Sequence, residues 1–471
     1  MKTAILLSLI LSCVTAWAKP TLVSRITHTP EGRPYLEVDG RPMVYNAVQA
    51  WKAPAPEFLM EGGYPDNMNK AHEVGYRIFT FWLTWRDLEP VRGQYDWSSM
   101  EAMIERAEEL DMRLDIVWGG SNFCSHLDPR FAPDWLLDWD AVHLRDEEGN
   151  FVKAHSGDFG KTRAVDHTNK VILEVEKEMV SSLMRYIKKR DKTHRVVFFQ
   201  VLNEPNMRGW THQDKEDVLT YVNDLAAVVK AADYQVATRT NLSGPNLEPD
   251  IELLEHIDAH GPDPYKKQID IIRKLIQMPT KFPHIAENAA YPNTTSLMMT
   301  TFAHGGGYNI YMLGPDLVWE NAGVYDINWE PWEVTYGVYN LNTAVNAIGA
   351  LLAVAPLEDM LDFNTELDEP NPNYKQMKQL GEREIGFTTW ARRGKGNGAV
   401  GMAIHKDGEF YLIADRISWF RFNDEPSYVS SGRFDLDGNW VESNRKYWHQ
   451  RDDGVFEVPY HAGECVRVRL K

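Results

Sequence analysis

Cysteine is scarce in this chain. Cys13, Cys124 and Cys465 are the three cysteines among 471 residues, and their wide spacing matches neither a disulfide framework nor a zinc site. Cys13 lies in the N-terminal apolar run, so two cysteines remain for the body of the protein. A single bridge between Cys124 and Cys465 is one interpretation, and two unpaired buried thiols are the simpler one.

Positive charge is also in short supply. The chain has 50 Lys and Arg residues against 68 Asp and Glu residues, so its formal net charge is -18. This balance opposes binding to nucleic acid or to anionic membranes. We therefore predict neither kind of partner and expect a protein that binds neutral ligands. The 16 tryptophans are many for this length, and they supply both core residues and flat apolar binding surfaces.

Long apolar runs are missing as well. The run 4–14 is shorter than the roughly 20 residues that a membrane-spanning helix needs, and we predict no later run long enough. Lys2 precedes this run and Ala16-Trp17-Ala18 follows it, which is the pattern of a cleaved export signal. We predict a signal peptide over 1–18 and a secreted or periplasmic protein. A lipoprotein anchored at Cys13 is the alternative.

Most of the remaining chain alternates short apolar runs with amphipathic helical stretches. Ser98-Ser99-Met100-Glu101 has the pattern of a capping box, and apolar residues at helical spacing mark helices around 172–187, 218–229, 269–276 and 341–354. No G-x-G-x-x-G follows the first predicted strand and no Walker motif is present, which argues against an open doubly wound sheet. Eight strand-then-helix units predict an α/β fold, a (β/α)₈ TIM barrel. The predicted strands are 43–48, 77–83, 113–118, 196–202, 236–241, 257–260, 283–286 and 308–313.

The pattern changes after the predicted barrel, which we place at 19–361. An acidic stretch with two prolines begins a predicted linker over 362–384. Short alternating runs separated by glycine turns then predict a small all-β, sandwich-like domain over 385–471. Within the barrel, the insertion 119–170 follows the third strand, and we expect it at the mouth.

The sharpest motif is Gln200-Val201-Leu202-Asn203-Glu204-Pro205-Asn206. Proline cannot continue a central strand, so the fourth strand ends here and leaves Glu204 at the catalytic face of a barrel. Glycoside cleavage needs one carboxyl group as a proton donor and a second carboxylate on the other face of the sugar. We predict Glu204 as the acid/base, with Asn203 bound to the sugar 2-hydroxyl. A helix-capping role for Glu204 is the alternative.

A second carboxylate ends the seventh predicted strand in His284-Ile285-Ala286-Glu287-Asn288. Strands four and seven lie across the barrel mouth from each other, so we predict Glu287 as the nucleophile. Glu320 and Asp263 are the alternatives. The neighbouring negative charge would keep Glu204 protonated by raising its pKa. Two carboxyl groups and water complete the reaction, so we expect no cofactor and no metal.

Other side chains near strand ends are candidates for sugar binding. Tyr265 follows the sixth strand and is placed to hydrogen-bond the nucleophile. Indole faces cover the C–H surface of a pyranose, although each tryptophan is equally suited to packing. Arg86 is a candidate for orienting Glu287, with an exposed ion pair as its alternative role. The expected sugar contacts are Asn203, Tyr265, Trp118, Asn122, Trp85 and Trp319.

These residues resemble the retaining glycosidases of the (β/α)₈ clan A, which carry Asn-Glu on strand four and Glu on strand seven. Trp82-Leu83-Thr84-Trp85-Arg86-Asp87-Leu88-Glu89-Pro90, followed by Gly93-Gln94-Tyr95-Asp96-Trp97, is similar to a segment common in that clan. Within the clan the chain most resembles bacterial β-galactosidase-like proteins of glycoside hydrolase family 35 that have a C-terminal β domain. Pro205 departs from that group and is typical of other families in the clan. The segments that carry the family resemblance are Trp118-Gly119-Gly120-Ser121, Ala132-Pro133-Asp134-Trp135, Met184-Arg185-Tyr186-Ile187, Gly261-Pro262-Asp263-Pro264-Tyr265 and Met312-Leu313-Gly314-Pro315-Asp316.

The resemblance implies a retaining β-glycosidase that works by double displacement. Its leading form is an exo-β-galactosidase-like enzyme with a carbohydrate substrate, a plant or algal oligosaccharide. Another β-exoglycosidase or an endo-glycanase of the same clan is the first alternative, and the loop 119–170 decides between a pocket and a cleft. A non-catalytic carbohydrate-binding protein is the remaining alternative.

Overall fold

The computed structural model describes residues 23–50, 60–121, 130–154, 163–205, 213–243, 251–265, 274, 281–290, 294–315, 323–364, 375–389 and 399–471. The predicted signal peptide and Cys13 lie outside these residues. So do Asn122, Cys124, Trp319 and Glu320, and most of the helix expected around 269–276.

Eight parallel strands form a closed barrel in the order β10-β11-β4-β5-β6-β7-β8-β9. Each corresponds to one predicted strand, so the predicted TIM barrel is confirmed. The first strand starts later than predicted, because Met43 belongs to a separate strand. The barrel strands are β4 (Asn46–Ala50), β5 (Ile78–Thr84), β6 (Arg113–Gly119), β7 (Val196–Val201), β8 (Ala237–Ser243), β9 (Ala259–Asp263), β10 (Phe282–Asn288) and β11 (Gly307–Tyr311).

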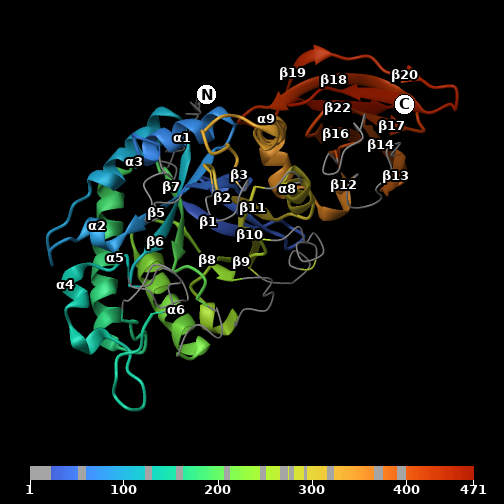
Figure 1. The fold of residues 1–471 in the computed structure, drawn as a ribbon. Helices are drawn as coiled ribbons and strands as arrows, with labels where there is room; N and C mark the ends of the chain where they lie inside the picture. The colour runs from blue at the N-terminus through green and yellow to red at the C-terminus, as the bar shows by residue number, and fades with distance from the viewer. Residues whose placement is uncertain are drawn as a thin grey trace, which may run out of the picture.

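Helices cover the outside of the barrel (Figure 1). Each buries an apolar stripe, as with Ile172, Met179 and Leu183 of α5. The capping box predicted at Ser98 is wrong: α3 begins at Ser98 itself, and Glu101 instead hydrogen-bonds Tyr186 and Arg190. The described helices are α1 (Tyr64–Glu73), α2 (Trp85–Leu88), α3 (Ser98–Glu109), α4 (Asp134–Leu137), α5 (Lys170–Arg190), α6 (Lys215–Ala231), α8 (Thr294–Ala303) and α9 (Glu333–Val354), with short 3₁₀ turns at Asp140–Val142, Ile251–Leu254 and Leu357–Asp359.

A three-stranded antiparallel sheet precedes the barrel and was not predicted. It consists of β1 (Ser24–His28), β2 (Pro34–Val38) and β3 (Arg41–Met43). Leu36 and Val38 pack against residues near the beginnings of the barrel strands, among them Ala47, Ile78 and Phe198. This sheet therefore covers the end of the barrel opposite to the C-terminal ends of the strands.

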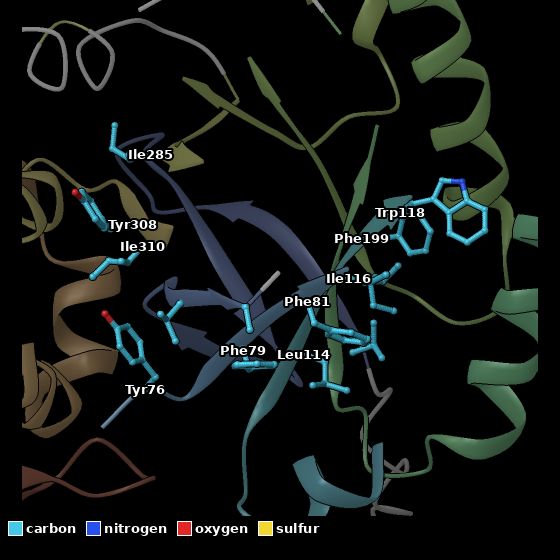
Figure 2. Packing of buried hydrophobic residues seen from close by; sticks show 14 of the residues in the cluster. Tyr76, Phe79, Phe81, Leu114, Ile116, Trp118, Phe199, Ile285, Tyr308 and Ile310 are labelled. Atoms are coloured by element: carbon cyan, nitrogen blue, oxygen red, sulfur yellow. The ribbon is translucent and has the colours of Figure 1, made fainter. Parts of the chain in front are cut away.

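Side chains of the barrel strands alternate between the lumen and the helices. Phe79 and Phe81 of β5, and Leu114, Ile116 and Trp118 of β6, belong to the apolar layer outside the barrel (Figure 2). The residues that alternate with the outward-facing ones point into the lumen, and several are polar although fully buried, including Thr80 of β5, Asp115 of β6 and Arg239 of β8. This alternation decides which side chains can reach the barrel mouth.

The C-terminal domain consists of two packed antiparallel sheets. Phe363, Phe387 and Phe420 contribute to the core between them. The predicted linker 362–384 overlaps the end of β12 and contains β13, and these two strands pair within the two sheets. The strands are β12 (Met360–Asn364), β13 (Lys375–Leu380), β14 (Arg383–Thr389), β15 (Val400–Lys406), β16 (Glu409–Ala414), β17 (Ser418–Phe422), β18 (Pro426–Phe434), β19 (Trp440–Arg445), β20 (His449–Gln450), β21 (Phe456–Tyr460) and β22 (Cys465–Leu470).

Helices α8 and α9 lie between the barrel and the C-terminal domain (Figure 1). Thr295 and Thr300 of α8 donate hydrogen bonds to Asp415 (3.0 Å) and Asp362 (2.9 Å). By length and composition α9 could cross a membrane, contrary to our expectation that no later run could, but half of its apolar stretch is buried inside the protein. Cys465 is a buried free thiol.

Candidate active site

The end of β7 has an unusual backbone. Leu202 (φ 58°) and Glu204 (φ 48°) both adopt the left-handed conformation, which costs on the order of 1 kcal/mol or more for a residue with a side chain. The amide N–H of Glu204 donates to Asn241 Oδ1 (2.9 Å), and Gln200 Nε2 donates to the same oxygen (3.1 Å) and to Asn203 Oδ1 (2.9 Å). These bonds hold Glu204 at the C-terminal end of the strand.

The carboxyl group of Glu204 contacts the ends of the next two strands. Ser243 of β8 and Asp263 of β9 are paired in register, and both hydrogen-bond the Glu204 side chain. Burial raises the pKa of Glu204, and the hydrogen bonds from Asp263 and Ser243 oppose that rise. We had expected a neighbouring negative charge to raise this pKa, but burial is the cause that raises it.

Glu287 reaches the lumen because β10 contains a bulge. His284 pairs with Gly307 and Ile285 with Tyr308, but Asn288 pairs with Ile310, so β10 has one extra residue between Ile285 and Asn288. An extra residue reverses the alternation of side chains beyond it. His284 faces the lumen beside Tyr45, and strict alternation from it would turn Glu287 toward the helices.

The carboxylate of Glu287 is held by two donors. The Tyr265 hydroxyl donates to Oε2 (2.8 Å) and Gln49 Nε2 donates to Oε1 (3.1 Å). Asn309 Nδ2 in turn donates to the carbonyl oxygen of Ala286 (2.9 Å), inside the bulge. The hydrogen bond from Tyr265 is the contact that its place after the sixth strand predicted.

Burial and the charge of Glu204 raise the pKa of Glu287 to about 7, against the effect of the hydrogen bonds from Tyr265 and Gln49 and of the Arg239 charge. Glu287 is 3% exposed. Two carboxyl groups that interact this strongly lose their protons as a pair. The site therefore favours one proton shared between Glu204 and Glu287 near neutral pH, which is the state that acid-assisted cleavage requires.

A buried ion pair lies in the same lumen. Arg239 of β8 and Asp115 of β6 are both fully buried and 2.8 Å apart. Tyr45 and Thr80 donate further hydrogen bonds to Asp115 (2.7 and 3.1 Å). Sequence reasoning missed this pair, together with Gln49, Asn241 and Ser243. Counting alternate residues back from the end of β8 would have placed Ser243, Asn241 and Arg239 on one face.

Two of the predicted sugar contacts are wrong. Trp118 and Trp85 are both 0% exposed and belong to the apolar layer outside the barrel. Trp118 lies beside Phe199 on the helix side (Figure 2), and its Nε1 donates to Glu176 of α5 (2.7 Å). Trp85 Nε1 donates to Glu89 (2.8 Å). Asp115 faces inward, so Trp118, three positions later in the same strand, faces outward. Trp82 of β5 faces the lumen instead, packed with Val117 and Phe131.

The structure also places the remaining predicted residues. Asn203 is buried, with its carbonyl oxygen bound by Gln200. Arg86 forms an exposed ion pair with Asp134 (3.0 Å), which was its alternative role, and it does not orient Glu287. Asp263, an alternative nucleophile, lies beside Glu204. Asn122, Trp319 and Glu320 lie outside the described residues.

The closed parallel barrel with two glutamates at the ends of β7 and β10 agrees with the expected resemblance to clan A glycoside hydrolases, and the comparisons with known proteins support a glycoside hydrolase. The family model for β-galactosidases of glycoside hydrolase family 42 matches residues 55–220. The match is to family 42, so the resemblance to family 35 stays a prediction.

Individual relatives agree with this class. The chain is 26% identical to human "Beta-galactosidase-1-like protein 3" over 131 residues, which are 27% of this chain and 19% of that protein. In fold it is similar to a β-galactosidase from the psychrophilic Marinomonas ef1 (TM-score 0.50, 11% identity, 64% of this chain and 60% of that one). It is also similar to an exo-β-1,4-mannosidase from Opitutaceae bacterium strain TAV5 (TM-score 0.51, 12% identity, 70% and 63%). The chain thus spans about a fifth of the human relative and less than two thirds of either solved structure.

Proposed function

We propose that this protein is a retaining β-glycosidase in which Glu204 is the acid/base and Glu287 is the nucleophile. One observation carries the proposal. A buried Glu287 that accepts hydrogen bonds from two donors shares the site with Glu204, whose position is set by the hydrogen bond of its own backbone N–H. Donors to Glu287 favour its ionised form, and burial of Glu204 favours its protonated form. These are the two states that double displacement needs at the start.

The reaction proceeds in two balanced steps. Glu287 attacks the anomeric carbon, the bond from that carbon to the glycosidic oxygen breaks, and the proton of Glu204 moves to the departing oxygen. Water then attacks the anomeric carbon, gives its proton to Glu204, and Glu287 leaves as a carboxylate. Tyr265 and Gln49 stabilise Glu287 whenever it is ionised. The N–H groups of Asn203 are available to a sugar hydroxyl, because its carbonyl oxygen is bound by Gln200.

We further propose a β-galactoside substrate cleaved from a chain end. The matched family model and the human relative both carry the β-galactosidase name. A different β-linked sugar is the second candidate, favoured by the fold similarity to an exo-β-1,4-mannosidase. Aryl glycosides that differ only in the sugar separate the two, because the preferred sugar gives the highest kcat/KM.

The catalytic assignment is tested with Glu204→Gln and Glu287→Gln, and with Glu178→Gln as a matched change at an exposed carboxylate. We expect Glu287→Gln to reduce turnover to background and Glu204→Gln to reduce it about 10²- to 10⁴-fold. Glu178→Gln should retain wild-type turnover. Proton NMR should show the β-anomer as the first product. Wild-type turnover in both site variants would remove the proposal, and an α-anomer first would remove retention.

We also propose that the protein is exported, because Lys2, the run 4–14 and Ala16-Trp17-Ala18 have the pattern of a cleaved signal. Sequencing the N-terminus of the mature protein tests this. Export with cleavage after Ala18 gives Lys19 as the first residue, whereas a lipoprotein begins at an acylated Cys13. An intact Met1 in protein recovered from the cytoplasm would contradict both.

A further inference from the structure

We infer that two buried asparagines are positioning residues for the two glutamates of the site: Asn241 holds the backbone of Glu204, and Asn309 holds the backbone beside Glu287. The inference rests on the proposed function and extends it to residues that act through the backbone rather than on the sugar. Each asparagine lies on the strand next to that of its glutamate. Asn241 is on β8 beside β7, and Asn309 is on β11 beside β10.

Asn241 holds a turn that is strained. Leu202 and Glu204 are both in the left-handed conformation, which residues with side chains keep only where their surroundings hold them. Asn241 Oδ1 accepts hydrogen bonds from the Glu204 amide N–H (2.9 Å) and from Gln200 Nε2 (3.1 Å). Asn241 is 0% exposed, so its loss would leave buried donors without this acceptor. The asparagine therefore sets where the Glu204 carboxyl group lies.

Asn309 has the corresponding place beside β10, but it acts as a donor. Its Nδ2 donates to the carbonyl oxygen of Ala286 (2.9 Å), inside the bulge that turns Glu287 into the lumen. The same Nδ2 donates to Gln49 Oε1 (3.4 Å), and Gln49 Nε2 donates to Glu287 (3.1 Å). Asn309 therefore contacts both the bulge and one of the donors to the nucleophile, and it is also 0% exposed.

The two asparagines should affect different parts of the reaction. Proton transfer requires the Glu204 oxygen within hydrogen-bond reach of the departing oxygen, so a displaced Glu204 loses acid catalysis while Glu287 still attacks. A displaced Glu287 attacks every glycoside more slowly, whatever the leaving group, because attack requires the reacting atoms to be closely aligned. The dependence of the rate on the leaving group therefore separates the two roles.

Leucine substitutions remove the amide groups and keep a similar volume. On an alkyl glycoside, whose leaving group needs a proton, we expect Asn241→Leu to lower kcat/KM about 10- to 100-fold. On a dinitrophenyl glycoside, whose leaving group needs no proton, Asn241→Leu should stay within about threefold of wild type. Asn309→Leu should lower kcat/KM about 10- to 100-fold on both glycosides.

Two further variants separate positioning from a general loss of structure. Asn241→Asp keeps an acceptor oxygen, so at its own pH optimum it should stay within about fivefold of wild type on both glycosides. Asn342→Leu is the matched control. Asn342 is also 0% exposed, but it donates to the carbonyl oxygen of Val74 (2.8 Å), near the beginnings of the barrel strands. Its loss should lower stability and leave both rates within about threefold of wild type.

Several kinetic outcomes would overturn the inference. For Asn241 they are equal slowing of both glycosides by Asn241→Leu, slowing of neither, or an Asn241→Asp variant as impaired as Asn241→Leu. For Asn309 the contrary outcome is a wild-type rate on either glycoside. A loss in Asn342→Leu as large as those in the other leucine variants would show that any buried asparagine has the same effect.

Hydrogen exchange keeps the inference testable even where Asn241→Leu fails to fold. Because the Glu204 amide is bonded to a buried acceptor, NMR of the wild-type protein should show it exchanging at least about 100-fold more slowly than an unprotected amide. Exchange at the unprotected rate would overturn the inference. The tests of Glu204→Gln and Glu287→Gln come first. If those variants retain turnover, the proposed function fails; if they lose it while the asparagine variants match wild type, this inference alone fails.

Discussion

Each face of β6 has a buried carboxyl group beside it, but the two carboxyl groups have different partners. On the inner face Asp115 is paired with the guanidinium of Arg239. On the outer face Trp118 and Tyr221 donate to Glu176, and no cation pairs with Glu176 in the part of the chain that the structure describes. Burial accordingly raises the pKa of Glu176. The pKa of Arg239 is raised against the effect of its burial by the charge of Asp115.

This difference shows how one strand serves two purposes. The inner face places fixed charge in the lumen beneath Glu287, whose pKa the Arg239 charge lowers. The outer face uses an indole, a residue well suited to sugars, to connect the barrel to α5. Residue type therefore says less about a role in binding than the side of the strand on which the residue lies.

Removing the inner cation should have the largest effect on stability. Arg239→Met leaves Asp115 charged and unpaired in the lumen, which should lower the free energy of unfolding by about 3–5 kcal/mol. Urea denaturation measures the change. Adding Asp115→Asn removes the unpaired charge and should recover part of the loss. A loss below about 1 kcal/mol would mean that the inner pair resembles an exposed one.

The second-largest effect is expected in the pH dependence of stability, which should reflect the raised pKa of Glu287. Its pKa is about 7 in the folded protein against 4.5 for an ordinary glutamate. The folded state therefore binds the proton more tightly, and stability falls as pH rises from about 4.5 to about 7. Relative to Glu287→Gln, the wild-type protein should lose about 2 kcal/mol between pH 5 and pH 8. Parallel curves for the two proteins, measured by denaturant unfolding, would contradict a raised pKa.

The smallest effect is expected on the outer face. Trp118→Phe keeps a ring in the apolar layer but removes the donor to Glu176, so the free energy of unfolding should fall by about 1–2 kcal/mol. KM and kcat on an aryl glycoside should not change, because Trp118 is fully buried outside the lumen. A several-fold rise in KM without loss of stability would instead support the original prediction that Trp118 contacts the sugar.

The barrel itself was predictable because its signal is local. Strands covered on both faces are short apolar runs, and all eight appear in the expected order. Glu204 was predictable as a residue near a strand end because Asn-Glu-Pro follows an apolar run, although β7 already ends at Val201 and Leu202 has a positive φ. The N-terminal sheet and the strands β12 and β13 were missed because each strand is only three to six residues long.

The sequence alone therefore specifies which residues lie near the ends of the strands, because the residues next to a strand determine where it ends. Which way a side chain faces, and what it meets there, was decided only in the tertiary structure. A single extra residue in β10 turns Glu287 into the lumen, and the register of β8 with β9 sets Asp263 beside Glu204. Trp118 faces the helices for the same reason. Pairing between strands that are separated in the chain determines these side-chain orientations, and no local sequence pattern encodes that pairing.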